Sequence, residues 1–250
     1  MADELTFRAL VLRETAVGDY DKLLTLIAED TGKILVSCKG VRNIKSHRLA
    51  STQLFCFNEI TVTIKKGRYF LKEASLIENF YAIREDIERL ALAQYVAQVT
   101  EEVCVEGEAD NDILALALNT LYMLSDSDKP MYHIKACFEL RLCALIGFMP
   151  DLTACRSCGA DSDKLLLDIG EGNLICADCA LDENAVGLTV ICKSTLDAMR
   201  YVINSPSKRI FAFSLDDGAY PEFASVCEGY IIYRLEKNFD TLKFYHSLGL

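Results

Sequence analysis

The hydrophobic period of the chain changes near residue 80, and this change limits the possible folds more than any other feature. Before it, short runs rich in β-branched and aromatic residues, bounded by turn residues, are typical of β-strands. These runs are residues 6–12, 22–29, 33–38, 54–66 and 69–78. Short strands leave exposed edges unless the sheet closes, and a small antiparallel barrel such as the five-stranded OB-fold removes those edges. We therefore expect a barrel in this part of the chain.

After residue 80 the apolar residues recur at helical spacing. Within 84–103, for example, Ile87, Leu90 and Ala91 follow the i, i+3, i+4 pattern of one helical face. Further helices are expected at 111–125, 131–148, 188–204 and 221–237. The predicted fold class is α+β, with an N-terminal small antiparallel β-barrel (OB-fold) followed by an all-α helical domain that carries a four-cysteine insertion.

These patterns divide the chain into four parts. Residues 1–80 form the barrel, 81–150 a helical domain, 151–187 the cysteine-bearing segment, and 188–250 the C-terminal helices that complete the helical domain. A chain of 250 residues is long enough to bury a sizeable core in such an arrangement.

Two Cys-x2-Cys pairs form the most specific motif in the chain. Cys155 and Cys158 precede Cys176 and Cys179 by 17 intervening residues, the spacing of a tetrahedral four-thiolate zinc site. Gly159 suits the tight turn that lets both thiolates of the first pair point at one ion. Because four cysteine ligands leave no open position for water, we expect one structural Zn²⁺ and disfavour a catalytic one.

The other readings of the cysteines are free thiols or a redox-active pair, and two pairs at this spacing favour the metal. A zinc-deaminase pattern is absent, because none of His47, His133 and His246 begins an H-x-E motif. The remaining seven cysteines are expected to be small buried apolar residues. They are Cys38, Cys56, Cys104, Cys137, Cys143, Cys192 and Cys227.

Charge is distributed unevenly along the chain. The formal net charge is −11, yet residues 1–80 carry 12 Lys/Arg against 10 Asp/Glu, and residues 81–250 carry 14 against 27. In the window 33–72 the count is nine basic residues to one acidic residue, Glu59. A polyanion responds to the local field within a Debye length of about 8 Å rather than to the net charge. The barrel half is therefore a candidate nucleic-acid surface.

The stretch KGVRNIKSHR, residues 39–48, concentrates this charge in a connection between strands. Lys39, Arg42, Lys45 and Arg48 recur at every third position, and long side chains on a mobile loop can follow a phosphate backbone without reading bases. A second basic turn could lie on the same side of the barrel, and it contains Lys65, Lys66 and Arg68. A merely solvated loop is the alternative interpretation of the stretch.

Four aromatic residues near these turns could stack on bases. They are Phe55, Phe57, Tyr69 and Phe70. A barrel this small needs large interior side chains, so a place in the core is the favoured interpretation of each and stacking is the alternative.

Motifs of common enzymes are absent from the sequence. It contains no G-x-x-x-x-G-K-[ST], no G-x-S-x-G and no H-E-x-x-H, and the carboxylates of 84–112 are expected on solvated helix and loop surfaces. We therefore expect a binding protein rather than an enzyme. No apolar run is long enough to span a bilayer, and the opening MADELTFRAL lacks the basic-then-apolar order of a secretion signal. A cytoplasmic protein that does not enter the membrane is expected.

The segment VLRETAVGDYDKLLTLIAEDTGKILVSCKGVRNIKSHRLASTQLF, residues 11–55, resembles the N-terminal region of the bacterial recombination mediator family RecO. That family shows a G-E/D-x-D-x-L-L pattern ending in G-K, followed by K-G-x-R-x-x-x-S. Here GDYDKLL starts at Gly18, Gly32–Lys33 ends the first pattern, and KGVR starts at Lys39 with Ser46 behind it. The resemblance continues through FELRLCALIGFMPDLTACRSCG and the cysteine pairs, and so covers about residues 6–180.

The resemblance implies an OB-fold, a helical domain, a zinc-bearing insertion and a role in DNA repair and recombination. Proteins of this family bind single- and double-stranded DNA without sequence preference and anneal complementary strands. With RecR they help to load RecA onto DNA coated by single-strand binding protein, whose acidic C-terminal tail is a further partner. Lys135, Arg141 and Arg200 are candidates, by composition only, for the residues that meet this tail. Association with the nucleoid follows from the same resemblance.

Two alternatives remain at the level of sequence. One is a zinc-containing nucleic-acid-binding regulator without annealing activity, which would read DNA or RNA through residues 151–187. That segment is rich in Asp and Glu and is poorly suited to a polyanion. The other is a cysteine-based oxidoreductase, which zinc content would separate from a metal-binding protein.

Overall fold

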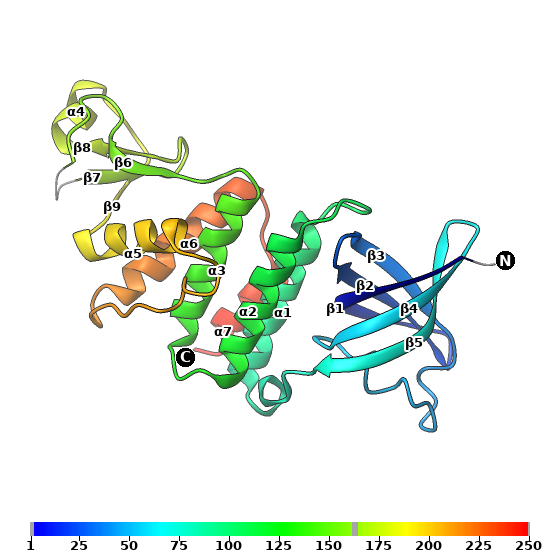
Figure 1. The fold of residues 1–250 in the computed structure, drawn as a ribbon. Coiled ribbons are helices and arrows are strands. Elements are labelled where there is room, and N and C mark those ends of the chain that lie inside the picture. Colours follow the sequence, from blue (N-terminus) through cyan, green and yellow to red (C-terminus); the bar gives the residue numbers. More distant parts are fainter. Residues whose placement is uncertain (1–2, 162–164, 250) are drawn as a thin grey trace. The chain divides into compact units, whose positions relative to one another are not determined.

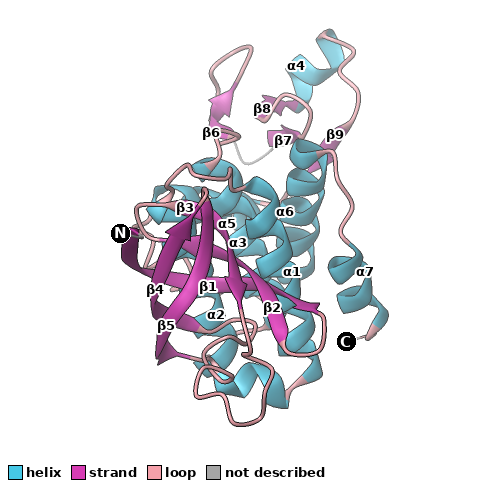
Figure 2. Cartoon of the chain, turned by 90° about the vertical axis from the view of Figure 1, so that its right-hand side faces the viewer, coloured by secondary structure: helices cyan, strands magenta, loops and turns pink. Residues whose placement is uncertain are grey.

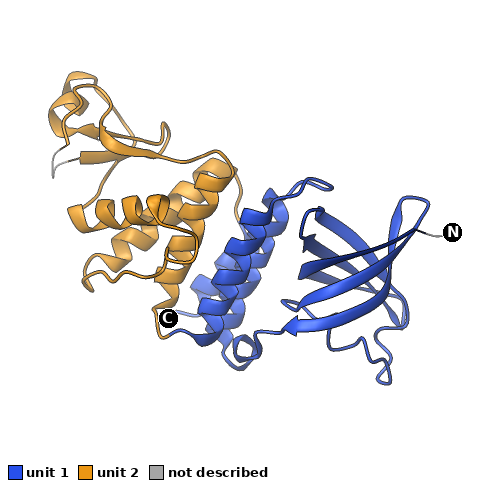
Figure 3. Ribbon diagram, viewed as in Figure 1, with its two compact units in different colours: residues 1–127, 239–250 blue, residues 128–238 orange. Residues whose placement is uncertain are grey.

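The structure is a computed structural model of the chain, and it describes residues 3–161 and 165–249. The chain forms two compact units (Figure 3). Unit 1, in blue, contains residues 1–127 and 239–250, and unit 2, in orange, contains residues 128–238. The expected division into four segments stays a prediction. The segment 188–250 contributes to both units, because the chain returns to unit 1 after residue 238.

Unit 1 begins with five strands, which Figure 1 shows in blue to cyan and Figure 2 in magenta. They are β1 (Asp3–Val17), β2 (Asp21–Ala28), β3 (Gly32–Cys38), β4 (Phe57–Lys65) and β5 (Arg68–Glu78). The sheet closes on itself in the order β1-β2-β3-β5-β4. The pairing of β3 with β5 is parallel, and the other pairings are antiparallel. The connection between β3 and β4 is the longest in the sheet, and it contains the basic stretch.

The sheet encloses a core built from alternate residues of each strand. In β1 the residues Phe7, Ala9 and Val11 face this core, and in β3 Ile34 and Val36 do so. Successive side chains of a strand point to opposite faces, so the intervening positions lie on the outer face of the sheet, where Leu10 and Leu12 of β1 are also buried. The β4–β5 connection is a two-residue turn, in which Lys66 and Gly67 both have positive φ, 51° and 72°. Such a turn matches the twist of the two strands.

Helices follow the strands, so the α+β class is confirmed. Unit 1 continues with the 3-10 helix η1 (Tyr81–Glu85), α1 (Ile87–Val103) and α2 (Asn111–Asp126), and it ends with α7 (Asp240–Ser247). Asp86 and Asp110 accept hydrogen bonds from the first backbone N–H groups of α1 and α2 and so fix where each helix begins. The sequence did not predict α7. It is anchored where Phe239, just before the helix, packs edge-on against Tyr95 of α1, with ring centroids 5.7 Å apart.

Unit 2 contains three longer helices and a small sheet. The helices are α3 (Met131–Leu145), α5 (Lys193–Asn204) and α6 (Tyr220–Leu235). The sheet contains β6 (Asp151–Cys155), β8 (Asn173–Cys176), β7 (Leu165–Asp168) and β9 (Leu188–Val190), in that order, and the short α4 (Ala177–Asp182) follows β8. The cysteine-bearing segment is therefore a small sheet with its own buried leucines, among them Leu167 and Leu174. Among the residues described, no helix is both long and apolar enough to cross a membrane.

Candidate nucleic-acid interface and metal centre

The basic loop, residues 39–48, leaves the end of β3 and lies against the β1–β2 turn. The backbone N–H of Gly40 donates to Asp21 Oδ1 at 2.8 Å, and the N–H of Arg42 donates to the carbonyl of Tyr20 at 2.9 Å. Within the loop, the Asn43 side chain accepts from the N–H of Lys45 at 3.1 Å. These bonds fix the path of the loop, because each satisfies a backbone donor that has no strand partner.

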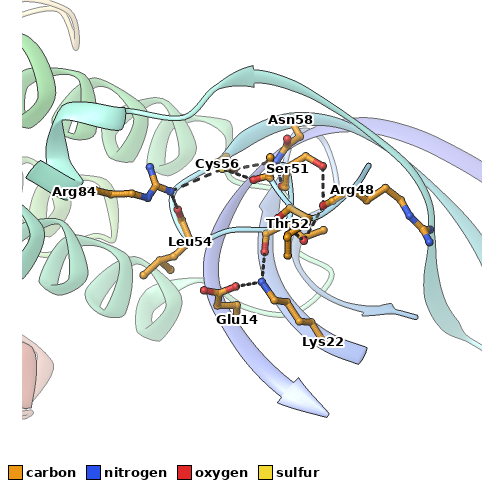
Figure 4. A network of polar contacts seen from close by, with 11 residues as sticks. Glu14, Lys22, Arg48, Ser51, Thr52, Leu54, Cys56, Asn58 and Arg84 are labelled. Atoms are coloured by element: carbon orange, nitrogen blue, oxygen red, sulfur yellow. Dashed lines mark hydrogen bonds and ion pairs between the residues drawn. The ribbon is translucent and has the colours of Figure 1, made fainter. Parts of the chain in front are cut away.

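Arg48 ties the far end of this loop to β5. Its Nη1 donates to the carbonyls of Leu71 and Lys72 at 3.3 and 3.4 Å, and its Nη2 donates to the carbonyl of Lys39 at 3.2 Å. Its own carbonyl accepts from Thr52 Oγ1 at 2.9 Å (Figure 4). The half-buried guanidinium therefore joins both ends of the loop to the strand that passes beneath it.

Side chains from other elements hold the rest of the β3–β4 connection (Figure 4). Lys22 pairs with Glu14 and donates to the carbonyl of Thr52 at 3.3 Å. Arg84 donates to the carbonyl of Leu54 at 2.6 Å, and Asn58 Nδ2 donates to the carbonyl of Ser51 at 2.9 Å. Side chains of β2, β4 and η1 therefore bind carbonyl groups in this part of the connection.

The three other cations of the basic loop are exposed. Arg42 donates through Nη1 to the carbonyl of Gly18 at 2.8 Å but neutralises no carboxylate there. The side chains of Lys39 and Lys45 have no hydrogen-bond or ion-pair partner within residues 3–161 and 165–249. Their charges are therefore available to a polyanion, whereas the half-buried Arg48 guanidinium also binds three carbonyl groups of the loop and β5.

The second basic turn is the β4–β5 hairpin. Lys65, Lys66 and Arg68 are all exposed there, and none has a side-chain partner in the described parts of the chain. The hairpin opens β5, whereas the basic loop is tied to the same strand at Leu71. Three residue steps of β5 separate Arg68 from Leu71, which is about 10 Å at the rise of an antiparallel strand. The two basic segments are therefore attached to one strand at two separate points.

Most of the aromatic candidates belong to the core. Phe55 and Phe57 are buried, and Tyr69 packs against the core of the sheet. Phe70 is half-buried and pairs with Thr63 of β4 and Ser37 of β3. The interior interpretation is confirmed for Phe55 and Phe57.

One exposed aromatic side chain near the basic loop was missed by sequence reasoning. Tyr20, in the β1–β2 turn, has 61% of its surface exposed. The sequence does contain a signal for it, since an aromatic residue that lies between two aspartates in a turn is expected to be exposed.

The four cysteines of the two Cys-x2-Cys pairs converge in unit 2. Their Sγ atoms all lie within 4.8 Å of one another, and those of Cys158 and Cys176 are 3.8 Å apart. An ion with four tetrahedral sulfur ligands at about 2.3 Å sets neighbouring sulfurs about 3.8 Å apart, so the cluster fits such an ion. Parallel pairing of β6 and β8 brings the pairs together, and Gly159 turns the first with a φ of 72°.

Local hydrogen bonds favour a thiolate at one of these positions. Backbone N–H groups of Cys158 and Cys176 donate to the sulfur of Cys155 and lower the pKa of its thiol to about 6. The side-chain contact with Cys176 raises the pKa of Cys179. Adjacent thiolates repel one another, so all four ionise together only around a cation. The donor set is therefore compatible with a metal site that has no open position.

Comparison with known proteins finds two family models that together cover most of the chain. The family model described as "Recombination protein O N terminal" matches residues 1–80, and "Recombination protein O C terminal" matches residues 84–243.

The chain belongs to the RecO family.

Curated relatives of this RecO chain cover almost its whole length. DNA repair protein RecO of Acetivibrio thermocellus is 32% identical over 96% of the chain and 95% of the relative. The proteins of the same name from Alkaliphilus metalliredigens and Desulforamulus reducens are 29% and 27% identical, over 93% and 96% of this chain and 95% and 93% of their own lengths. The chain is thus a member of a family of DNA repair proteins.

Two further expectations about this RecO chain need correction. Cys192 is exposed, whereas the other six cysteines outside the cluster are buried. It precedes the first turn of α5, where its backbone N–H donates to Glu222 Oε1 at 2.8 Å and its side chain lies outside the helix packing.

The second correction concerns the candidate tail-binding cations. Lys135 is only 2% exposed, between Glu139 at 3.0 Å and Glu228 at 2.7 Å, so its ammonium cannot meet a partner. Arg141 donates to the carbonyl of Ile203 at 2.6 Å, and Arg200 to that of Leu152 at 2.7 Å. Both guanidinium groups thus already donate hydrogen bonds to backbone carbonyls of unit 2. Composition alone could not show these partners, which lie up to 93 residues away in the chain.

Proposed function

We propose that this chain is a non-enzymatic recombination mediator in DNA repair. It binds single- and double-stranded DNA without sequence preference and anneals complementary strands. With RecR it helps to load RecA onto DNA coated by single-strand binding protein. The observation that carries the proposal is the set of exposed cations that have no carboxylate partner among the described residues, at two points of one strand. That set is Lys39, Arg42, Lys45, Lys65, Lys66 and Arg68.

The roles of these residues follow from their surroundings. Each free ammonium or guanidinium contacts a phosphate, and such contacts position a strand without reading its bases. Arg48 is a positioning residue, because its bonds to Lys39, Leu71 and Lys72 hold the loop in place. We assign the closed five-stranded sheet to the OB-fold, since that fold is a five-stranded barrel that binds oligonucleotides on its surface and loops.

Annealing follows from a clamp that grips only the backbone. A strand held by its phosphates keeps its Watson–Crick edges free, and the basic surface lowers the repulsion between two complementary strands. Neither step breaks a covalent bond, so no nucleophile or general base is required. We place the protein in the cytoplasm, in association with the nucleoid, where its DNA and its partners RecR and single-strand binding protein occur.

We further propose that Cys155, Cys158, Cys176 and Cys179 hold one structural Zn²⁺ per chain. The ion supplies no chemistry beyond fixing the ends of β6 and β8 and the start of α4, because all four positions are filled by sulfur. The carboxylate-rich segment around it makes a poor surface for DNA. This argues against the regulator hypothesis, in which the segment reads nucleic acid.

The test is a double charge reversal on the basic loop, Lys39→Glu with Lys45→Glu. Neither side chain has a partner in the described structure, so the fold should persist while DNA binding and annealing are lost at low salt. Lys208→Glu with Arg209→Glu is the matched control, because both residues are exposed in unit 2 and the change in net charge is the same. Unchanged affinity of the loop variant at low salt would refute the DNA-binding surface. Binding without annealing by the wild type would instead favour the regulator.

A further inference from the structure

Three apolar side chains are exposed at the junction of the β1–β2 turn and the basic loop. Val17 is the last residue of β1 and Tyr20 lies in the turn, with 48% and 61% of their surfaces exposed, and Ile44 comes from the loop, with 92% exposed. We call these three residues the apolar tip. Single exposed apolar residues are ordinary on protein surfaces, so the tip needs a reason only because of what surrounds it.

Hydrogen bonds join the two segments that carry the apolar tip. The N–H of Arg42 donates to the carbonyl of Tyr20, and its guanidinium donates to the carbonyl of Gly18. Asp21 accepts from the N–H of Gly40. Tyr20 therefore lies directly beside Arg42, in the same small surface as the other free cations of the loop. Cations next to an exposed aromatic ring are the combination by which proteins bind single-stranded nucleic acids.

We propose that Tyr20 is a base-stacking residue and that the apolar tip makes this face prefer single-stranded over double-stranded DNA. The inference rests on the proposed function and names the form of DNA that this part of the surface recognises. When Arg42 and Lys45 hold phosphates of a single strand, an unpaired base next to them can leave water by lying on the phenol ring. The bases of a duplex are already stacked and paired, so they offer the ring no free face.

Fluorescence tests the stacking directly, because the chain contains no tryptophan. In the variant Tyr20→Trp, the tryptophan emission, excited where tyrosine does not absorb, comes from position 20 alone, and a base stacked on the indole should quench it. Tyr81→Trp is the matched control, because Tyr81 is 62% exposed but belongs to η1. Titration with oligo-dT should quench the Tyr20→Trp protein strongly, a blunt duplex should quench it much less, and neither should change the control. Equal quenching by both DNAs, or none by oligo-dT that is bound, would overturn the proposal.

Affinities supply the second measurement. Replacing Tyr20 by Ala should weaken binding of oligo-dT by roughly 5- to 100-fold, because stacking on an aromatic ring contributes about that much per base. Tyr20→Phe should retain the wild-type affinity, since the ring remains, and neither change should alter duplex binding by more than about twofold.

The outcomes separate this inference from the proposed function. If the wild type binds oligo-dT and Tyr20→Ala binds it equally well, stacking is refuted while the phosphate contacts stand. If the wild type binds neither DNA, both fail. Vesicles containing anionic lipid test another role for a basic surface with an apolar tip. Binding of such vesicles that is lost in Tyr20→Ala, with oligo-dT affinity unchanged, would overturn the stacking role.

Discussion

Replacing Arg48 by Ala should destabilise the fold without removing a phosphate contact. The guanidinium donates to three main-chain carbonyls at 3.2 to 3.4 Å, the long end of the range for such bonds. Assigning each the lower part of the usual net contribution gives a loss of about 2 kcal/mol in the free energy of unfolding. For a protein of this size, that loss lowers the midpoint of thermal unfolding by about 4 to 8 °C.

The salt dependence of DNA binding then separates this structural role from a phosphate contact. On single strands, log K falls with log salt by about 0.7 per neutralised phosphate. Arg48→Ala should leave that slope unchanged. The comparison variant Lys45→Ala should reduce it by about 0.7 and leave the unfolding midpoint almost unchanged, because the Lys45 side chain has no partner in the described residues. The reasoning would be refuted if Arg48→Ala lowered the slope by that amount while the protein unfolded at the wild-type temperature.

Two further perturbations probe unit 2. Replacing Cys155 by Ser should abolish the one-to-one zinc content and lower the unfolding midpoint more than it lowers annealing per folded molecule. Loss of annealing in a fully folded variant would contradict a structural metal. Burial lowers the pKa of His133 to about 4, below the value of about 6.5 in an unfolded chain. The unfolded state therefore binds a proton first as pH falls from about 6.5 to about 4, and stability should drop by up to about 3 kcal/mol relative to His133→Phe. A constant difference between the two proteins in urea unfolding across this range would exclude the effect.

The elements that the sequence predicted are those whose pattern is local. Short runs of β-branched and aromatic residues between turn residues indicated the strands, and the spacing of Cys155, Cys158, Cys176 and Cys179 indicated the metal site. Both patterns result from geometry that repeats over a few residues, so they can be recognised without knowing which distant residues pack against them. The cluster within 4.8 Å confirms that the four residues converge.

The features that the sequence did not predict depend on partners far along the chain. Helix α7 has eight residues and is fixed by contacts such as Phe239 with Tyr95, 144 positions earlier. Arg48 could not be distinguished from Lys45 by composition, because its partners are carbonyl groups and any residue has one. Lys135 resembled a surface cation until Glu139 and Glu228 were seen to enclose it. Basic residues in a sequence therefore predict a basic surface only once it is known which of them are bound by other residues of the chain.

The pairing of charges within unit 1 explains how an acidic chain keeps a basic surface. Several carboxylates of this unit are used in ion pairs with cations outside the basic loop and the β4–β5 hairpin. These pairs are Arg8 with Glu29, Arg13 with Glu101, Lys22 with Glu14, and Lys72 with Glu4. Each pair neutralises one acidic and one basic charge, so these carboxylates do not offset the positive charge of the loop and hairpin cations. A phosphate within about 8 Å of them experiences that local excess rather than the net charge of −11. Association with DNA should accordingly be fast and salt-sensitive for an acidic protein, since steering depends on the local field.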